Sequence, residues 1–399
     1  MNARTTSETP ALPDPPGDAR THSERLAAHI REALAAAGGR IPFRQYMELA
    51  LYAPGLGYYA GAGGAGLGAR TDFVTAPELS PLFARCLARQ CAETLGALGG
   101  GDLLEPGAGS GILAAGLLVE LERLDSLPRR YRILEVSAEL AARQRATLAE
   151  RVPHLLDRCV WESAWPAPFE GLVLANEVLD AIPVEGFRIA DGGVEQRCTV
   201  SDGEGFADTW APAPEALARA VAHVEADLGY RLPTGYVSEL RPQLGAWFEG
   251  LSSALSRGAI VLIDYGYVRR EYYLAERNVG TLVCTRAHRA HGDPYDWPGL
   301  TDLTAFVDFT AVTEAAVAAG FELEGFTPQA HFLFSTGLED VAAEALTADD
   351  ERERLLASQA VKKLTLPGEM GEKFNVIGFS RGLDAPMRGF AGNDLSYRL

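Results

Sequence analysis

Asp102-Leu-Leu-Glu-Pro-Gly-Ala-Gly-Ser-Gly-Ile-Leu113 is the segment most informative about the fold, because a short apolar run ends in an acid and three alternate glycines. It predicts a buried strand, a tight turn and, over residues 112–124, an amphipathic helix. Gly107, Gly109 and Gly111 can adopt positive φ and have no Cβ. The backbone of this turn can therefore approach a nucleotide-like ligand closely.

The acid before the glycines distinguishes between the nucleotide sites that use such a turn. A dinucleotide site presents its turn to a pyrophosphate, which a carboxylate would repel. Glu105 stands two residues before Gly107, where it suits a cationic ligand. S-adenosyl-L-methionine fits, because it has an ammonium, a sulfonium and no phosphate. The alternative is that Glu105 is simply a solvated strand end.

A second acid supports the same cofactor. Residues 131–135 predict the next strand, and this strand ends about at Glu135. The spacing from the glycine turn is roughly that at which a carboxylate receives the ribose hydroxyls of an adenosine cofactor. The two acids together favour a cofactor site over a solvated strand end.

Composition limits the class of protein. The chain has 399 residues, of which 47% are hydrophobic, so it can bury a large core and exceeds one minimal domain. It carries 36 basic and 54 acidic side chains, a net charge of −18. This charge disfavours a general binder of nucleic acid. The five cysteines are scattered without a CxxC pair, which favours reduced thiols and no metal site.

Targeting signals are absent from the sequence pattern. No apolar run approaches the length of a membrane span, and the N-terminus lacks the hydrophobic core of a secretory signal. Residues 1–20 are expected to form a disordered leader, and their acidic side chains are not typical of a mitochondrial transit peptide. We therefore expect a cytoplasmic, bacterial protein without membrane insertion.

Apolar, β-branched runs alternate with helical patterns along the chain. Strands are predicted at residues 102–105, 131–135, 159–162, 172–175, 259–266, 321–327 and 374–380. Such alternation predicts an α/β fold with a mostly parallel, Rossmann-like sheet covered by helices on both faces. Ligands bind at the carboxyl ends of the strands in this architecture.

The remaining segments are assigned around this core. Helices are predicted at residues 24–37, with Ser23 as the N-cap, and 41–52. The glycine-rich run at residues 61–68 is either a lid or a linker. The expected division is a leader (1–20), an N-terminal helical segment (21–96), a methyltransferase-type core (97–185, 236–266 and 310–381), two substrate-binding insertions (186–235 and 267–309) and a tail (382–399).

Polar residues directly follow the fourth predicted strand. Asn176, Glu177 and Asp180 should project toward the reactive end of a bound cofactor. Methyl transfer needs alignment of the nucleophile and exclusion of water. Paired acids suit a positively charged nucleophile such as an arginine side chain, because they can orient it and accept charge or a proton. The alternative is that the acids cap a following helix, which Pro183 would end early.

Other polar groups leave two interpretations open. Asp72, Thr75 and Glu78 precede a predicted helix over residues 79–95, and they are either site residues or turn and capping groups. Asp264 and Tyr265 end the fifth strand. They either face the substrate channel or satisfy loop amides.

The second insertion contains a histidine pair. His288 and His291 are spaced as metal ligands can be, but arginines interleave with them and no third ligand is evident. We therefore predict no metal site.

Eight motifs together resemble the MidA-like, S-adenosylmethionine-dependent methyltransferases, whose mitochondrial members are protein arginine methyltransferases needed for respiratory complex I assembly. The motifs are Pro54-Gly-Leu-Gly-Tyr-Tyr59, Asp72-Phe-Val-Thr-Ala-Pro-Glu78, Leu104-Glu-Pro-Gly-Ala-Gly-Ser-Gly111, Leu134-Glu-Val-Ser137, Ala175-Asn-Glu-Val-Leu-Asp-Ala-Ile-Pro-Val184, Ile263-Asp-Tyr-Gly266, Asp302-Leu-Thr-Ala305 with Val307-Asp-Phe309, and Met370-Gly-Glu-Lys-Phe374. They span nearly the whole chain in order, which makes the resemblance far more specific than the glycine turn alone.

The resemblance implies a class I methyltransferase fold with an added substrate-binding lobe, and symmetric dimethylation of a protein arginine. It implies that Asn176, Glu177 and Asp180 line the reacting centre. S-adenosyl-L-homocysteine would be the product of the cofactor. The residues expected in the cofactor site and its neighbouring wall are Glu105, Gly107, Gly109, Gly111, Glu135, Asp72, Thr75, Pro77 and Glu78.

Two positions depart from the family pattern. Thr71 stands where a glycine is common, and Phe306 stands where a histidine is common. The second departure concerns the substrate and not the cofactor. The leading hypothesis is a protein arginine methyltransferase that acts on a partner such as a respiratory complex I subunit. The alternatives are a small-molecule methyltransferase and an assembly factor that binds S-adenosylmethionine without turnover.

Overall fold

The computed structural model describes residues 12–61, 75–203, 205–347 and 349–399. An eight-stranded sheet forms its centre, in the order β15-β16-β10-β5-β2-β3-β4, with β14 added to the end of β10. The strands are β2 (Asp102–Pro106), β3 (Tyr131–Leu134), β4 (Cys159–Glu162), β5 (Phe169–Asn176), β10 (Leu255–Tyr267), β14 (Val307–Asp308), β15 (Glu322–Pro328) and β16 (Phe374–Arg381). All seven predicted core strands are present.

Strand direction in this sheet is mostly parallel. The pairs β4–β3, β3–β2, β2–β5 and β5–β10 are parallel, whereas β16 runs antiparallel to both β10 and β15. The carboxyl ends of the five parallel strands therefore meet at one edge of the sheet. The predicted α/β, Rossmann-like class is confirmed.

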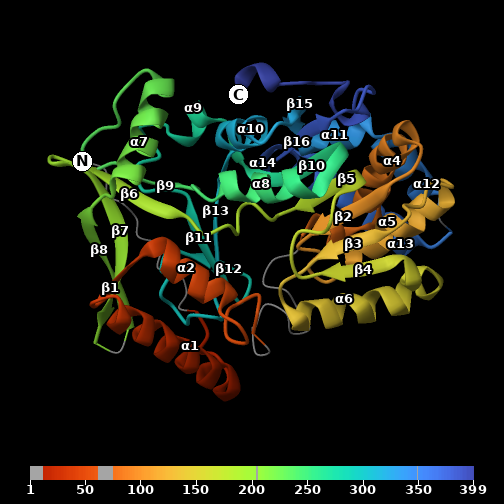
Figure 1. Ribbon diagram of the computed structural model, residues 1–399. Coiled ribbons are helices and arrows are strands. Elements are labelled where there is room, and N and C mark those ends of the chain that lie inside the picture. Colours follow the sequence, from red (N-terminus) through yellow and green to blue (C-terminus); the bar gives the residue numbers. More distant parts are fainter. Residues whose placement is uncertain (1–11, 62–74, 204, 348) are drawn as a thin grey trace.

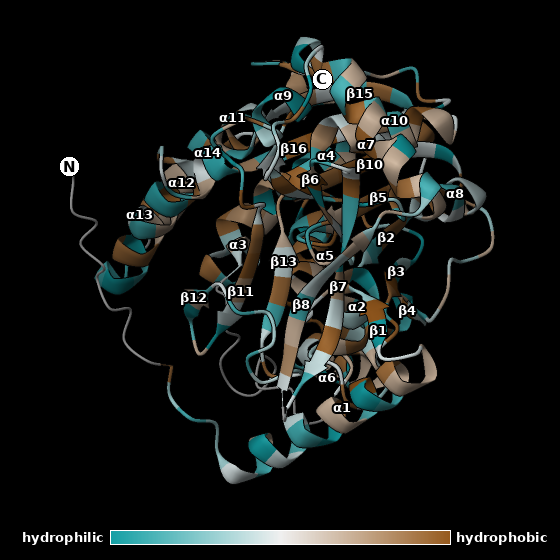
Figure 2. Ribbon diagram, turned by 90° about the vertical axis from the view of Figure 1, so that its left-hand side faces the viewer, coloured by the Kyte–Doolittle hydropathy of each residue, from teal (hydrophilic) through white to brown (hydrophobic). Residues whose placement is uncertain are grey.

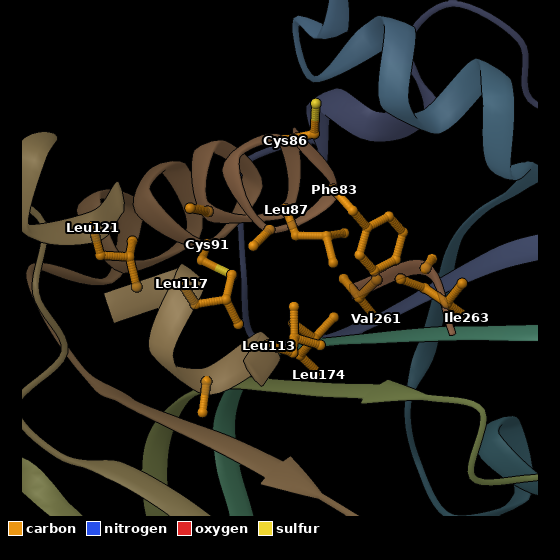
Figure 3. Packing of buried hydrophobic residues seen from close by; sticks show 14 of the residues in the cluster. Phe83, Cys86, Leu87, Cys91, Leu113, Leu117, Leu121, Leu174, Val261 and Ile263 are labelled. Atoms are coloured by element: carbon orange, nitrogen blue, oxygen red, sulfur yellow. The ribbon is translucent and has the colours of Figure 1, made fainter. Parts of the chain in front are cut away.

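Alternate residues of the central strands supply two separate cores. Leu172 and Leu174 face α4 (Pro81–Leu98) and α5 (Ile112–Arg123), whereas Val173 faces α8 (Leu244–Ala254) and α10 (Phe309–Ala318). Figure 3 shows side chains of α4 and α5 meeting Leu174 and Val261 of the sheet. Because both faces of each strand are buried, the strands are apolar throughout.

Further helices extend the first of these cores. α6 (Ala138–Arg151) contributes Leu148 to it and lies beside β4 at the end of the sheet (Figure 1). The helices near the C-terminal end of the chain are α11 (Gln329–Ser335), α12 (Leu338–Leu346), α13 (Glu351–Thr365) and α14 (Met370–Lys373). Residues 382–399 fold back, and Phe390 of this tail is buried against Gly325 and Gly378.

A second, antiparallel sheet builds the lobe on the left of Figure 1. It contains β1 (Arg40–Pro42), β6 (Glu185–Ala190), β7 (Gly193–Asp202), β8 (Gly205–Pro212) and β9 (Val237–Leu240). Most of β6 and all of β7 and β8 come from the first predicted insertion, residues 186–235. One predicted domain boundary needs correction. The sequence division placed β9 in the core segment 236–266, but β9 pairs with β6 and belongs to the lobe.

The second insertion forms a small sheet of its own. β11 (Leu282–Arg286) pairs with β12 (Arg289–His291) and β13 (Asp302–Ala305). Helices α7 (Glu215–Leu228) and α9 (Arg269–Tyr272) share a buried cluster with Phe187 of β6. Ala305 donates its backbone N–H to the carbonyl of Asp180, so this sheet is tied to the loop after β5.

The N-terminal segment differs in part from the prediction. α1 (Gly17–Ala36) begins before Ser23, which is buried within the helix and does not cap it; residues 17–20 are therefore helical and are not a disordered leader. Its outer turns carry hydrophilic residues (Figure 2). α2 (Phe43–Tyr52) lies within the predicted range. Of the glycine-rich run, all but Gly61 lies outside the described residues.

Two further local predictions need correction. The single helix predicted over residues 79–95 is divided into α3 (Ala76–Leu79) and α4, and Ser80 caps α4 by accepting the N–H of Leu82. The loop after β5, residues 177–184, contains turns and no helix. Glu177 and Asp180 therefore cap no helix there.

The five cysteines are all free thiols. Across the described ranges, no helix is long and apolar enough to cross a membrane. Within the same ranges, no group of three or more His, Cys, Asp or Glu side chains is arranged so that it could hold a metal ion.

Candidate active site

A cavity of about 800 Å³ opens at the carboxyl ends of β2, β3, β5 and β10. Residues from the core, from the N-terminal segment and from the second insertion line it. Among the described residues, its wall contains one lysine, Lys373, and six carboxylic acids: Glu78, Glu105, Glu135, Glu177, Asp180 and Asp302. This excess of acids favours cationic ligands.

The glycine turn forms one wall of the cavity. Gly107, Gly109 and Gly111 have φ values of +64°, +52° and +80°, a region that side chains disfavour. Gly107 and Gly109 line the cavity, and a Cβ on Gly109 would enter open space. Gly111 does not line it, which departs from the expectation. A Cβ there would lie 3.1 Å from the Cα of Gln144.

Glu105 is buried at the end of β2 beside this turn, with 3% of its surface exposed. It is therefore not a solvated strand end. The hydroxyl of Tyr131 donates a 2.5 Å hydrogen bond to its Oε2. Burial raises the pKa of Glu105 to about 7, and the hydrogen bond opposes that shift. A cation in the cavity would favour the ionised form further.

Glu135 follows β3 on the other side of the turn. Its Oε1 accepts the backbone N–H of Ser137 at 2.9 Å, and its Oε2 accepts an N–H of the Gln144 side chain at 2.9 Å. Burial raises its pKa, and these hydrogen bonds oppose the rise. Both oxygens are thus fixed while the carboxylate still lines the cavity.

The segment before α4 supplies a further wall. Thr75, Pro77 and Glu78 line the cavity, and Ser110 donates a 3.2 Å hydrogen bond to Glu78. Glu78 also lies in the first turn of α3, so both interpretations of this residue apply. Asp72 lies outside the described residues.

The polar residue that ends β5 and two acids of the following loop come together at the cavity. Asn176 donates a 3.1 Å hydrogen bond to Glu177, whose φ of +54° is strained for a side chain other than glycine. Burial, together with the nearby Asp180 carboxylate, raises the pKa of Glu177 to about 8. Within the described part of the chain, Asn176 Oδ1 and Asp180 Oδ1 are buried without a hydrogen-bond partner. These two buried oxygens can therefore accept hydrogen bonds from a bound ligand.

Asp264 fixes the loop that carries these acids. Its Oδ2 accepts the backbone N–H groups of Leu179 at 2.9 Å and Asp180 at 3.2 Å. It thus satisfies loop amides, whereas its neighbour Tyr265 lines the cavity and hydrogen-bonds Asp180. Burial, reinforced by the Asp180 and Glu177 carboxylates, raises the pKa of Asp264 well above its ordinary value.

Sequence reasoning missed a group of cavity residues from other segments. Tyr52 donates to the carbonyl of Ala181 at 3.0 Å, and Tyr59 donates to Asp302 at 2.8 Å. The rings of the two tyrosines stack with centroids 5.6 Å apart. Tyr59 and Asp302 both lie in motifs on which the family resemblance rests. Their place in these motifs is the sequence signal by which they could have been found.

A partly buried arginine that follows β9 reaches the same loop. Arg241 donates to the carbonyls of Asp180, Ala305 and Phe306. Its charge lowers the pKa of Asp180, although burial raises that pKa overall. Phe306 lines the cavity and packs against Tyr265 and Tyr267. Nothing in the local pattern around Arg241 indicated this role.

The donor and acceptor set fits an adenosine cofactor with a cationic amino acid portion. Glu105 and Glu135 stand on either side of a turn that leaves open space at Gly109. The mostly parallel sheet, this turn and the two acids define a class I, S-adenosyl-L-methionine-dependent methyltransferase.

The comparisons with known proteins assign the family. A family model described as "Putative S-adenosyl-L-methionine-dependent methyltransferase" matches residues 86–327. The chain belongs to this family and to its MidA-like members, and S-adenosyl-L-methionine is its cofactor.

Curated relatives and a solved structure resemble nearly the whole chain. The mitochondrial protein arginine methyltransferase NDUFAF7 of Homo sapiens is 29% identical, over 84% of this chain and 79% of its own length. The Danio rerio protein of that name is 26% identical, over 88% and 86%. A Burkholderia thailandensis protein, crystallised with S-adenosyl-homocysteine, is 45% identical over 98% of this chain and 100% of its own, with a TM-score of 0.90.

Proposed function

We propose that this methyltransferase modifies an arginine side chain of a partner protein. The observation that carries the proposal is the pair of acids after β5, of which Asp180 is buried and Glu177 is partly buried. Both line the cavity, and Asp180 Oδ1 has no hydrogen-bond partner within the described part of the chain. A guanidinium supplies planar N–H donors and a positive charge, which are what this pair lacks.

The chemistry assigned to these residues is alignment and charge compensation. Bound cofactor supplies an electrophilic methyl group. Glu177 and Asp180 orient the guanidinium so that one nitrogen faces that methyl group, and one carboxylate accepts the proton that the nitrogen releases. The pKa of Glu177, about 8 before a cation binds, places the group close to proton exchange at neutral pH. The surrounding aromatic residues exclude water from the reacting atoms.

Cofactor contacts are assigned to residues at the ends of β2 and β3 and to the segment before α4. We assign Glu105 to the cationic amino acid portion and Glu135 to the ribose hydroxyls. Gly107 and Gly109 permit close approach, and Thr75, Pro77 and Glu78 form the neighbouring wall. This division leaves Asn176, Glu177 and Asp180 free for the substrate.

The identity of the partner rests on the relatives. Proteins named as mitochondrial arginine methyltransferases match the chain over most of both lengths. With the family resemblance, they support a protein substrate such as a respiratory complex I subunit, with symmetric dimethylation as the product.

The test is a labelling experiment. Purified protein and S-adenosyl-L-methionine with a labelled methyl group are incubated with extract from a bacterial host lacking the gene, and labelled proteins are analysed by mass spectrometry. We expect dimethylarginine in a protein. Label only in small molecules would favour a small-molecule methyltransferase, and cofactor binding without any transfer would favour an assembly factor.

Matched amide variants test the reacting centre. Glu177→Gln combined with Asp180→Asn keeps the size of both side chains and removes both charges. We expect loss of arginine methylation with S-adenosyl-L-homocysteine affinity kept within about threefold of the unmodified protein, because the proposed cofactor contacts lie elsewhere. Methylation at the full rate would refute the assigned roles.

A further inference from the structure

Gln144 lies at the centre of a fully formed hydrogen-bond network behind the cavity. Its side chain, on α6, has no exposed surface. Its Nε2 donates to the carbonyl of Gly109 at 3.1 Å and to Oε2 of Glu135 at 2.9 Å. Its Oε1 accepts the indole N–H of Trp161 at 3.1 Å. Both amide hydrogens and the amide oxygen are therefore used.

The third glycine of the turn explains how this side chain comes so close. A Cβ on Gly111 would stand 3.1 Å from the Cα of Gln144 and 3.4 Å from its carbonyl oxygen. The absence of a side chain at Gly111 lets α6 approach the turn. Gly111 thus contributes to the site through α6, whereas Gly107 and Gly109 form the cavity wall.

Trp161 determines which way the amide points. If the amide were reversed, its oxygen would face the Glu135 carboxylate and the Gly109 carbonyl, which are both acceptors. Its NH₂ group would then face the indole N–H, which is a donor. Trp161 on β4 is itself covered by the guanidinium of Arg145, 3.8 Å from the ring centroid. The orientation of the amide is therefore set by its neighbours.

We propose that Gln144 is a positioning residue for the cofactor: its amide holds the Glu135 carboxylate and the Gly109 carbonyl in fixed relation, and Trp161 orients that amide. The network joins Gly109, in the turn after β2, to Glu135, which follows β3. It restricts the Glu135 carboxylate before the cofactor arrives, which reduces the ordering that binding requires. The inference rests on the proposed cofactor role of Glu135.

A double-mutant cycle tests the proposal with S-adenosyl-L-homocysteine as the calorimetric probe. We expect Gln144→Met to weaken binding about tenfold, because a hydrogen bond to a charged group is lost. In a Glu135→Ala background, where no carboxylate remains to be held, the same change should weaken binding less than about twofold. A merely structural role of Gln144 would give equal losses in both backgrounds and would overturn the proposal.

The Glu135→Ala variant alone separates the two hypotheses. If it leaves the affinity unchanged, the cofactor role of Glu135 is wrong, and the role of Gln144 falls with it. If it weakens binding while Gln144→Met does not, only the role of Gln144 is refuted.

Two further variants keep the test decisive if Gln144→Met is poorly folded. Gln144→Glu is nearly isosteric and places a second acid against Glu135, so it should weaken binding more at pH 8 than at pH 6. Trp161→Phe keeps an aromatic ring but removes the N–H, and should weaken binding about threefold. Unchanged affinity in both would refute the proposal.

Gln90 provides the matched control. It is a buried glutamine on α4 that bonds Thr94 and the backbone N–H of Gly389, away from the cavity wall. Gln90→Met should lower the melting temperature but leave probe affinity unchanged. An equal loss of affinity in this variant would show that deleting any buried amide disturbs the site, and would overturn the specific role of Gln144.

Discussion

The hydroxyl of Tyr131 donates a 2.5 Å hydrogen bond to Glu105, and both side chains are buried at the start of the glycine turn. The two residues lie on the adjacent parallel strands β2 and β3, where Tyr131 pairs in register with Leu103 and Glu105 with Ile133, so their contact is diagonal. Burial raises the pKa of Glu105 to about 7, while Tyr131 lowers it. An acid that titrates near neutrality therefore lies in the wall of a site for a cationic cofactor.

This relationship predicts pH-dependent cofactor binding. Glu105 is increasingly protonated as the pH falls below about 7, so affinity for S-adenosyl-L-homocysteine should fall in that direction. Tyr131→Phe removes the hydrogen bond that lowers the pKa and should move the midpoint of this fall to higher pH. Calorimetric titration of both proteins from pH 5.5 to 8.5 measures the shift. Coincident profiles would contradict the role of Glu105, because the ligand's own titration is common to both proteins.

Burial of Glu177 predicts that the reacting centre destabilises the cofactor-free protein at high pH. The pKa of Glu177 is about 8 in the folded state and ordinarily 4.5. Between these two pH values Glu177 is therefore mostly protonated in the folded protein and mostly ionised in the unfolded protein. The free energy of unfolding should fall as pH rises from about 4.5 to 8 and then level off. Glu177→Gln should thus be more stable than the unmodified protein at pH 9 by on the order of 2 kcal/mol.

Urea unfolding without cofactor, at pH 4.5 and at pH 9, measures this difference. The gain should be largely absent at pH 4.5, where Glu177 is protonated when folded. The same stability difference at both pH values would mean that the effect of the substitution is one of packing and not of charge.

Asp264 should be needed to keep the acid loop in place. In Asp264→Ala the backbone N–H groups of Leu179 and Asp180 lose their shared acceptor, so unfolding should cost about 2–4 kcal/mol less. Methyl transfer should fall at least tenfold, because Asp180 is no longer held. Asp264→Asn keeps one side-chain oxygen and should retain more of both properties. Stability and activity are measured on the same samples, and an active Asp264→Ala protein would refute the role.

The glycine turn offers a matched pair of substitutions. Gly109→Ala and Gly111→Ala both place a side chain at positive φ, which costs roughly 1–2 kcal/mol at each position. Gly111→Ala also presses on Gln144, whereas Gly109→Ala meets open space. We expect Gly111→Ala to lower the melting temperature more, and Gly109→Ala to weaken S-adenosyl-L-homocysteine binding directly. Equal effects of the two on both measurements would contradict this division of roles.

The core of the fold could be predicted because its signals are local. Each buried strand is a short apolar run, and the glycine turn with its acid lies within a dozen residues of β2. The start of α1 and the end of the leader were misplaced, because propensity near Ser23 does not reveal that the helix extends back to Gly17. The helix of the alternative interpretation after β5 is absent, since the chain there forms turns that Asp264 holds.

The fold class, the cofactor type and the position of Asn176, Glu177 and Asp180 at a strand end could be predicted, because these follow from periodicity and from residues adjacent in the chain. Which distant groups join them depends on the packing of the folded chain. Tyr59 meets Asp302, Arg241 reaches the carbonyl of Asp180, and the approach of α6 to Gly111 brings Gln144 to Glu135. Such contacts depend on how helices and lobes pack, and no local pattern specifies that packing.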